Sequence, residues 1–92
     1  MTTCLRVVVS GRVQGVWFRA WTERKAKSLG LDGWVRNCRD GSVEAVISGE
    51  DAAVAAMLAA LWEGPDLARV ESVQQHPHDE AITPGFMVRP SG

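Results

Sequence analysis

Short strands and helices alternate along this chain in an order that allows few folds. The order is strand–helix–strand, twice, followed by one further short strand. Strand segments are rich in β-branched residues, helical segments carry apolar residues three or four positions apart, and glycines or prolines separate them. The strands are predicted over residues 5–10, 33–38, 42–48, 67–75 and 85–89, and the helices over residues 18–29 and from 49–51 to 64–65. Two strand–helix–strand units of this length pack best as one sheet with both helices on one face.

This order predicts an α+β fold, the ferredoxin-like βαββαβ two-layer sandwich, with a mostly antiparallel sheet and a short fifth strand. In that arrangement the first two strands run parallel and the third lies between them. The carboxyl ends of the first two strands therefore meet at one edge of the sheet. Because residues 11–19 follow the first strand and Asn37 lies near the end of the second, we expect them to lie close together.

Each predicted helix has one apolar face that would pack on the sheet. The face of the first helix consists of Phe18, Thr22, Ala26 and Leu29, and that of the second consists of Val54, Met57, Leu58, Leu61 and Trp62. The spacing therefore predicts that Trp62 has a structural role, whereas Trp21 lies off the apolar face of its helix and is expected to be partly exposed.

The composition is that of an ordinary globular domain, with 46% hydrophobic and 23% charged residues. A length of 92 residues predicts a single domain over residues 1–92. No apolar run approaches the ~20 residues of a membrane span, and no charged leader precedes the first apolar stretch. We therefore expect a cytoplasmic protein with no membrane partner, and a monomer.

The net charge of −1 hides a strong asymmetry along the chain. Residues 1–39 carry eight Arg or Lys side chains and two acids, a net charge of +6, whereas residues 40–92 carry two Arg and nine acids, a net charge of −7. The near-neutral total argues against a nucleic-acid partner. The basic half is where an anionic ligand is expected to bind.

The loop before the first helix has the features of an anion-binding site. Gly11 and Gly15 allow the backbone to turn closely, and the helix beginning at about residue 18 leaves free N–H groups at its positive end. Arg19 lies in the first turn, where a cation is disfavoured by the helix dipole. That cost is reasonable if the guanidinium shares an oxyanion with the loop amides. A solvent-facing arginine is the alternative.

Asn37 also has two interpretations. Asparagine is common near turns, so its side chain could stabilise the hairpin turn predicted at Asp40-Gly41. Alternatively, its amide could orient a water molecule in line with a phosphate held by the loop, since an amide both donates and accepts hydrogen bonds.

A site of this kind suits one class of phosphate compound. A phosphate ester usually requires a general acid or a metal to assist its poor leaving group. An acyl phosphate releases a carboxylate of low pKa, so positioning and neutralisation of the phosphoryl oxygens suffice.

Four segments strongly resemble the acylphosphatase family over about residues 7–73: GRVQGVWFR (11–19), LGLDGWVRN (29–37), DGSVEAVISG (40–49) and GP (64–65). A weaker match covers residues 85–89. The resemblance implies a ferredoxin-like fold and the hydrolysis of acyl phosphates, without a cofactor or metal, to a carboxylate and inorganic phosphate. It further implies that Arg19 binds the phosphate and that Asn37 positions the attacking water. The phosphate-binding residues it implies are Gln14, Gly15, Val16, Trp17, Phe18 and Arg19, through the loop amides and the arginine side chain.

Two positions depart from the usual family pattern. Trp17 replaces what is often a smaller residue or a different aromatic, which would alter the rim of the site facing the acyl group. Cys38 stands after Asn37 where Thr or Ser is common, which affects hydrogen bonding there. Neither change removes a catalytic role.

Other candidate sites and function classes have less support. His76 and His78 lack further ligands at suitable spacing, so an exposed loop is expected rather than a metal site. Cys4 and Cys38 fall at opposite ends of their strands, about 20 Å apart, which is beyond disulfide reach.

Among binding modules, an RNA-binding sheet would need aromatic residues on its central strands, and a metal chaperone would need paired thiols. The two central strand segments contain no aromatic residue and the chain has no C-x-x-C motif. A domain that binds acyl phosphate or carbamoyl phosphate without turnover remains the alternative to an enzyme.

Overall fold

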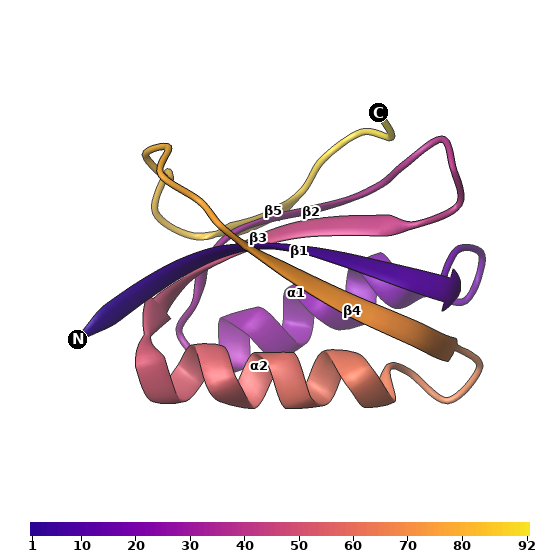
Figure 1. Cartoon of the computed structure of the whole chain (residues 1–92), viewed down its shortest axis with the longest axis horizontal. Coiled ribbons are helices and arrows are strands. Elements are labelled where there is room, and N and C mark those ends of the chain that lie inside the picture. Colours follow the sequence, from indigo (N-terminus) through magenta and orange to yellow (C-terminus); the bar gives the residue numbers. More distant parts are fainter.

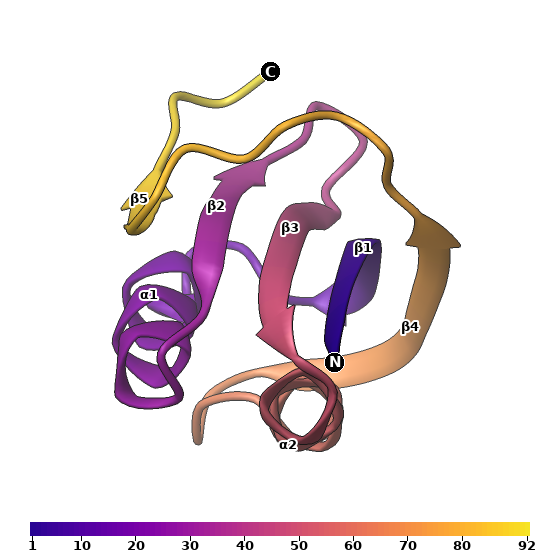
Figure 2. The same ribbon diagram turned by 90° about the vertical axis from the view of Figure 1, so that its left-hand side faces the viewer.

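The computed structural model describes all 92 residues and contains one sheet covered on one face by two helices (Figures 1 and 2). The elements are β1 (Thr2–Arg12), α1 (Phe18–Ser28), β2 (Asp32–Asn37), β3 (Val43–Glu50), α2 (Asp51–Glu63), β4 (Arg69–Pro77) and β5 (Phe86–Val88). The predicted order of elements is confirmed, and each predicted element overlaps an observed one.

The sheet has the strand order β4-β1-β3-β2-β5. Both β1 and β2 pair antiparallel with β3, so they run parallel to each other on its two sides, as predicted. β4 pairs antiparallel with β1, and the short β5 pairs parallel with β2. This confirms the α+β, ferredoxin-like arrangement and places the ends of β1 and β2 at one edge of the sheet.

Two strands, β1 and β3, are longer than predicted and β4 is shifted by two residues, and the pairing explains each difference. β1 begins at Thr2 because its first residues pair with the end of β3, and it continues through Gly11 by a register shift against β4. β3 likewise extends to Glu50. β4 continues to Pro77 although a loop was expected from residue 76, since an edge strand tolerates proline.

The core lies between the sheet and the helices. The predicted face of α1 is confirmed, with Phe18, Thr22 and Ala26 buried. On α2 only Val54, Met57 and Leu61 are buried, and the prediction for Trp62 is wrong because its side chain is 50% exposed. The buried stripe of this helix is narrower than the apolar sequence indicates, because it follows the positions i, i+3 and i+7 and leaves Trp62, at i+8, beside it.

The face of the sheet without helices carries a charged cluster. The Glu44 carboxylate accepts hydrogen bonds from Arg6 Nη1 at 3.0 Å and from Arg36 Nε at 2.8 Å. The guanidinium groups of Arg36 and Arg89 lie 5.4 Å and 4.6 Å from the ring centre of Trp34. The side chains of Arg6 and Arg36 thus cover Glu44, which keeps this residue largely buried. Those of Arg36 and Arg89 cover the Trp34 ring.

Candidate active site

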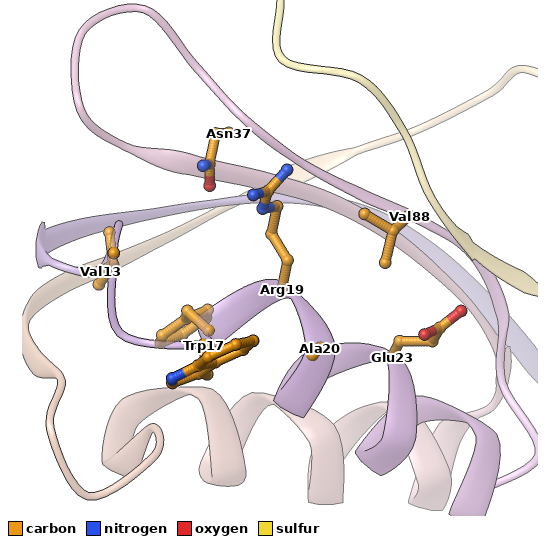
Figure 3. A pocket seen from close by; sticks show the side chains of 9 residues that line it. Val13, Trp17, Arg19, Ala20, Glu23, Asn37 and Val88 are labelled. Atoms are coloured by element: carbon orange, nitrogen blue, oxygen red, sulfur yellow. The ribbon is translucent and has the colours of Figure 1, made fainter.

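A cavity of about 480 Å³ opens where β1 and β2 end, at the amino end of α1 (Figure 3). Its walls are formed by Val13, Gly15, Trp17, Phe18, Arg19, Ala20, Glu23, Asn37 and Val88. Eight of these nine residues come from the basic half of the chain. Arg19 and Asn37, brought together by the parallel placement of β1 and β2, therefore face one cavity as the topology predicted.

The loop between β1 and α1 (residues 13–17) turns through unusual backbone angles. Gly15 has a φ angle of 74°, and Trp17 has a φ of 64° and a ψ of 21°, the only left-handed residue other than glycine in the chain. Alternating left- and right-handed residues direct successive N–H groups to one side, which forms an anion-binding concavity. In this loop the N–H groups of residues 14–17 donate to no other backbone group.

Those unpaired donors are continued by the helix itself. The first N–H groups of any α-helix lack an acceptor within the helix and carry the positive end of its dipole. The residue preceding α1, Trp17, supplies no side-chain hydrogen bond to them, and the first turn contains no acidic residue. The amino end of α1 therefore adds free donors and positive potential to the cavity.

The Arg19 side chain rises from the first turn of α1 into the cavity and points toward Asn37 (Figure 3). The three ion pairs of the structure involve other residues. Arg19 lines the cavity and takes part in no ion pair, so its guanidinium is available to an anion there.

Asn37 is the last residue of β2, and its Oδ1 atom is buried without a hydrogen-bond partner. The hairpin turn is stabilised instead by Asp40, whose carboxylate accepts from the Ser42 N–H at 3.0 Å and from the Ser42 hydroxyl at 2.6 Å. These hydrogen bonds lower the pKa of Asp40 below its usual 3.8, and the one from the Ser42 hydroxyl has the largest effect. The turn does not need the Asn37 side chain, which leaves that amide directed into the cavity.

The six residues predicted to bind phosphate occupy different positions. Gly15, Trp17, Phe18 and Arg19 line the cavity, with the Trp17 side chain 78% exposed at its mouth. Val16 is buried in the core, so only its backbone can face a ligand. Gln14 uses its side-chain amide elsewhere, donating to the carbonyl oxygens of Cys38 and Ser42.

Sequence reasoning missed four residues that line the cavity, Val13, Ala20, Glu23 and Val88. Glu23 lies one turn after Arg19 on α1, and this i, i+4 spacing was a signal that could have identified it. Val88 belongs to β5, and the sequence contains no signal for the pairing of this strand with β2.

The remaining predictions for sites concern metals, thiols and membranes. No group of three or more His, Cys, Asp or Glu side chains is arranged to hold a metal ion, and His76 and His78 do not form one. Cys4 and Cys38 are both free thiols, as expected. Neither helix is long and apolar enough to cross a membrane.

Comparisons with known proteins agree with the fold. The acylphosphatase family model matches residues 5–88. An acylphosphatase of Rhodospirillum rubrum is 53% identical over 87 residues, which cover 95% of this chain and 96% of that protein. A solved acylphosphatase from Coxiella burnetii superposes with a TM-score of 0.91 at 42% identity, over 96% of this chain and 93% of the other.

A second solved structure, the acylphosphatase of Bacillus subtilis, has a TM-score of 0.85 at 33% identity, over 97% of this chain and 99% of that one. These similarities extend over nearly the whole length of both partners. The chain therefore belongs to the acylphosphatase family, the enzymes that hydrolyse acyl phosphates.

Proposed function

We propose that this enzyme holds the phosphoryl group of an acyl phosphate with Arg19 and the backbone amides of residues 14–19, and that Asn37 positions the attacking water. The observation that carries the proposal is the placement of the Arg19 side chain and the unpartnered Asn37 Oδ1 around one cavity. A buried polar atom without a protein partner is uncommon, and Asn37 Oδ1 retains its capacity to accept a hydrogen bond.

The phosphate end of the cavity combines two kinds of donor. The fork of the Arg19 guanidinium fits two phosphoryl oxygens, and the loop amides fit the third. Both are already oriented before the substrate arrives, so little reorganisation is required as negative charge shifts in the transition state. The strained backbone of Trp17 is consistent with a loop shaped for a ligand.

The reaction then needs only one positioned water. The water oxygen attacks phosphorus from the Asn37 side, and the bond between phosphorus and the acyl oxygen breaks. The electron pair of that bond remains on the departing carboxylate, while the protons of the water pass to solvent or to the product phosphate. Because the carboxylate is a stable anion, the leaving group requires no protonation. Asn37 orients the water through Oδ1 without accepting its proton.

The assignment is tested by hydrolysis of benzoyl phosphate and acetyl phosphate in the presence of a chelator. We expect turnover by the wild type and a loss of about a thousandfold or more in Arg19→Ala. Arg24→Ala is the matched control, because Arg24 is an exposed arginine of the same helix outside the cavity. A folded wild-type protein inactive on several acyl phosphates, or an equal loss in both variants, would contradict the proposal.

The two roles are separated by inhibition. Asn37→Ala should lower kcat while inorganic phosphate still inhibits the residual activity, because Asn37 contacts the water rather than the phosphate. Arg19→Ala should lose both turnover and inhibition by phosphate. If phosphate no longer inhibits Asn37→Ala, the division of roles is wrong.

The cytoplasmic location, the monomeric state and the single-domain organisation over residues 1–92 remain predictions from the sequence. Cell fractionation and light scattering on the purified protein test the first two.

A further inference from the structure

The cavity carries opposite charges at its two ends. Arg19 and the loop amides make one end positive, whereas Glu23 places a carboxylate in the wall one helical turn farther along α1. Figure 3 shows the Glu23 carboxylate on the side of Val88, away from Val13 and the loop. Apart from Arg19, Glu23 is the only ionisable residue that lines the cavity.

We infer that Glu23 sets the charge preference for the acyl group: it disfavours acyl phosphates that bear a second anionic group and favours neutral or cationic ones. The inference rests on the proposed binding of the phosphoryl group at Arg19. With the phosphate there, an acyl group that extends along α1 passes Ala20 and Val88 and approaches Glu23.

The distance is suitable for such an effect. The backbones of residues four apart on an α-helix are separated by about 6 Å along its axis, and their side chains lie on the same face of the helix. This separation is close to the length of an acyl chain of a few carbons or of a benzoyl ring. A substituent at the far end of such a group would lie near the Glu23 carboxylate, and the apolar walls between Arg19 and Glu23 would contact the chain or ring itself.

The ion pair of Glu23 reduces its charge effect without abolishing it. Lys27 Nζ lies 3.3 Å from Glu23 Oε2, but Lys27 is 58% exposed and does not line the cavity. Exposed i, i+4 pairs are weak and mobile. The Glu23 side chain is 31% exposed and lies closer to the cavity than its partner does. A charged acyl substituent inside the cavity therefore lies closer to the Glu23 carboxylate than to the Lys27 ammonium group.

Coulomb's law gives the size of the preference. Two unit charges about 6 Å apart, at an effective dielectric constant of about 40 to 80, change a rate or binding constant by about threefold to tenfold. Ionic strength reduces this factor, because the cavity is open to solvent.

Three matched substrates test the inference: benzoyl phosphate, 4-carboxybenzoyl phosphate and 4-(aminomethyl)benzoyl phosphate. The measured quantity is the kcat/KM of each charged substrate divided by that of benzoyl phosphate. In Glu23→Gln we expect this ratio to rise about threefold to tenfold for the carboxy substrate and to fall for the aminomethyl substrate. Intrinsic differences between the leaving groups cancel, because each ratio is compared between two enzymes.

Two further variants sharpen the comparison. Glu63→Gln removes one negative charge from an exposed position on α2 outside the cavity, so its ratios should equal those of the wild type. Lys27→Gln leaves Glu23 without its partner, so discrimination against the carboxy substrate should increase.

Several outcomes would overturn the inference. If the three kcat/KM values and their ratios are the same in Glu23→Gln and the wild type, the acyl group does not approach this carboxylate. If all three kcat/KM values change by the same factor, so that the ratios stay unchanged, Glu23 acts on Arg19 or on the helix rather than on the acyl group. These failures differ from failure of the proposed function, in which the wild type would hydrolyse none of the three substrates.

Discussion

The side-chain amide of Gln14 donates a 2.8 Å hydrogen bond to the carbonyl oxygen of Cys38, the residue directly after Asn37. The same nitrogen donates to the carbonyl oxygen of Ser42 at 2.8 Å, across the hairpin turn. β1 and β2 do not pair with each other, because β3 lies between them. Gln14 is therefore a direct polar link between the loop that precedes Arg19 and the hairpin that follows Asn37.

We expect Gln14→Ala to weaken catalysis through position rather than through contact with substrate. Loss of two hydrogen bonds to part-buried carbonyls should lower the free energy of unfolding by about 1–3 kcal/mol. A shift of about 1 Å between loop and hairpin should lower kcat by up to about a hundredfold. Urea unfolding and steady-state kinetics on benzoyl phosphate measure the two effects. A variant with unchanged kcat would show that this link does not position the site.

Trp17 should be replaceable by glycine at little cost in stability. Its left-handed backbone is strained by about 1–2 kcal/mol, which glycine relieves, while the flexibility of glycine in the unfolded chain offsets about 0.5–1 kcal/mol. The side chain is mostly exposed, so little buried surface is lost. We expect the free energy of unfolding of Trp17→Gly to stay within about 1 kcal/mol of the wild type.

The same variant should change substrate preference. The indole at the cavity mouth can stack on an aromatic acyl group, so the kcat/KM ratio of benzoyl phosphate to acetyl phosphate should fall about two- to tenfold. Trp62→Ala, which removes an exposed tryptophan outside the cavity, should leave that ratio unchanged. A ratio unaffected in Trp17→Gly would exclude stacking.

Gly33 should tolerate no side chain. It has a φ of 136°, and a Cβ atom there would lie 1.8 Å from the carbonyl oxygen of Val46 on β3. We expect Gly33→Ala to lose about 3 kcal/mol or more of stability. Gly41→Ala is the control, since Gly41 also has a positive φ but no atom within 4 Å of the added group, and strain alone should cost about 1–2 kcal/mol. Equal losses in urea unfolding would contradict this explanation.

Glu44 should matter for stability, because its carboxylate pairs with two arginines on the face of the sheet that the helices leave uncovered. Glu44→Ala leaves both without that partner, and we expect a loss of about 1–3 kcal/mol. Glu71→Ala, at an exposed position of β4, should stay within about 0.5 kcal/mol of the wild type. Thermal unfolding of the two variants distinguishes them, and similar transitions would rule out a stabilising role for the cluster.

The hairpin turn should give the protein an acid-sensitive contribution to stability. Hydrogen bonds from Ser42 lower the pKa of Asp40 in the folded state below 3.8, so the folded protein favours the charged form. The resulting stabilisation is present above pH 3.8 and is lost as the pH falls through the lowered value. Asp40→Asn cannot titrate, so the stability difference between wild type and variant should shrink below that pH. Stability is measured from about pH 2 to about pH 6, roughly 2 units on either side of an ordinary aspartate pKa. A stability difference between wild type and Asp40→Asn that does not change over this range would refute the explanation.

The sequence predicted the parts of this fold that depend on local periodicity and chain order. The four-residue spacing of Phe18, Thr22 and Ala26 identified the buried face of α1, and the strand–helix–strand order placed β1 and β2 on either side of β3. That placement predicted that Arg19 and Asn37 lie close together, and both line one cavity.

Other features depend on tertiary packing, for which the sequence contains no local pattern. Trp62 continues an apolar stripe but lies beyond the part of α2 that the sheet covers. Val88 reaches the cavity through a parallel pairing of β5 with β2 that has no local signal. The burial of Asn37 Oδ1 is also a tertiary property, because it depends on groups from other elements around the end of β2.

The position of β3 between β1 and β2 determines the width of the site. Neighbouring strands in any sheet lie about 4.8 Å apart, so the two strand ends that carry the loop and Asn37 are separated by about 9.6 Å. That span accommodates a phosphoryl group and one water molecule in line. It is maintained by main-chain hydrogen bonds along β3, which form whatever side chains the strand carries. The separation of the two strand ends is therefore less sensitive to substitution than the position of the loop and the charge and rim of the site.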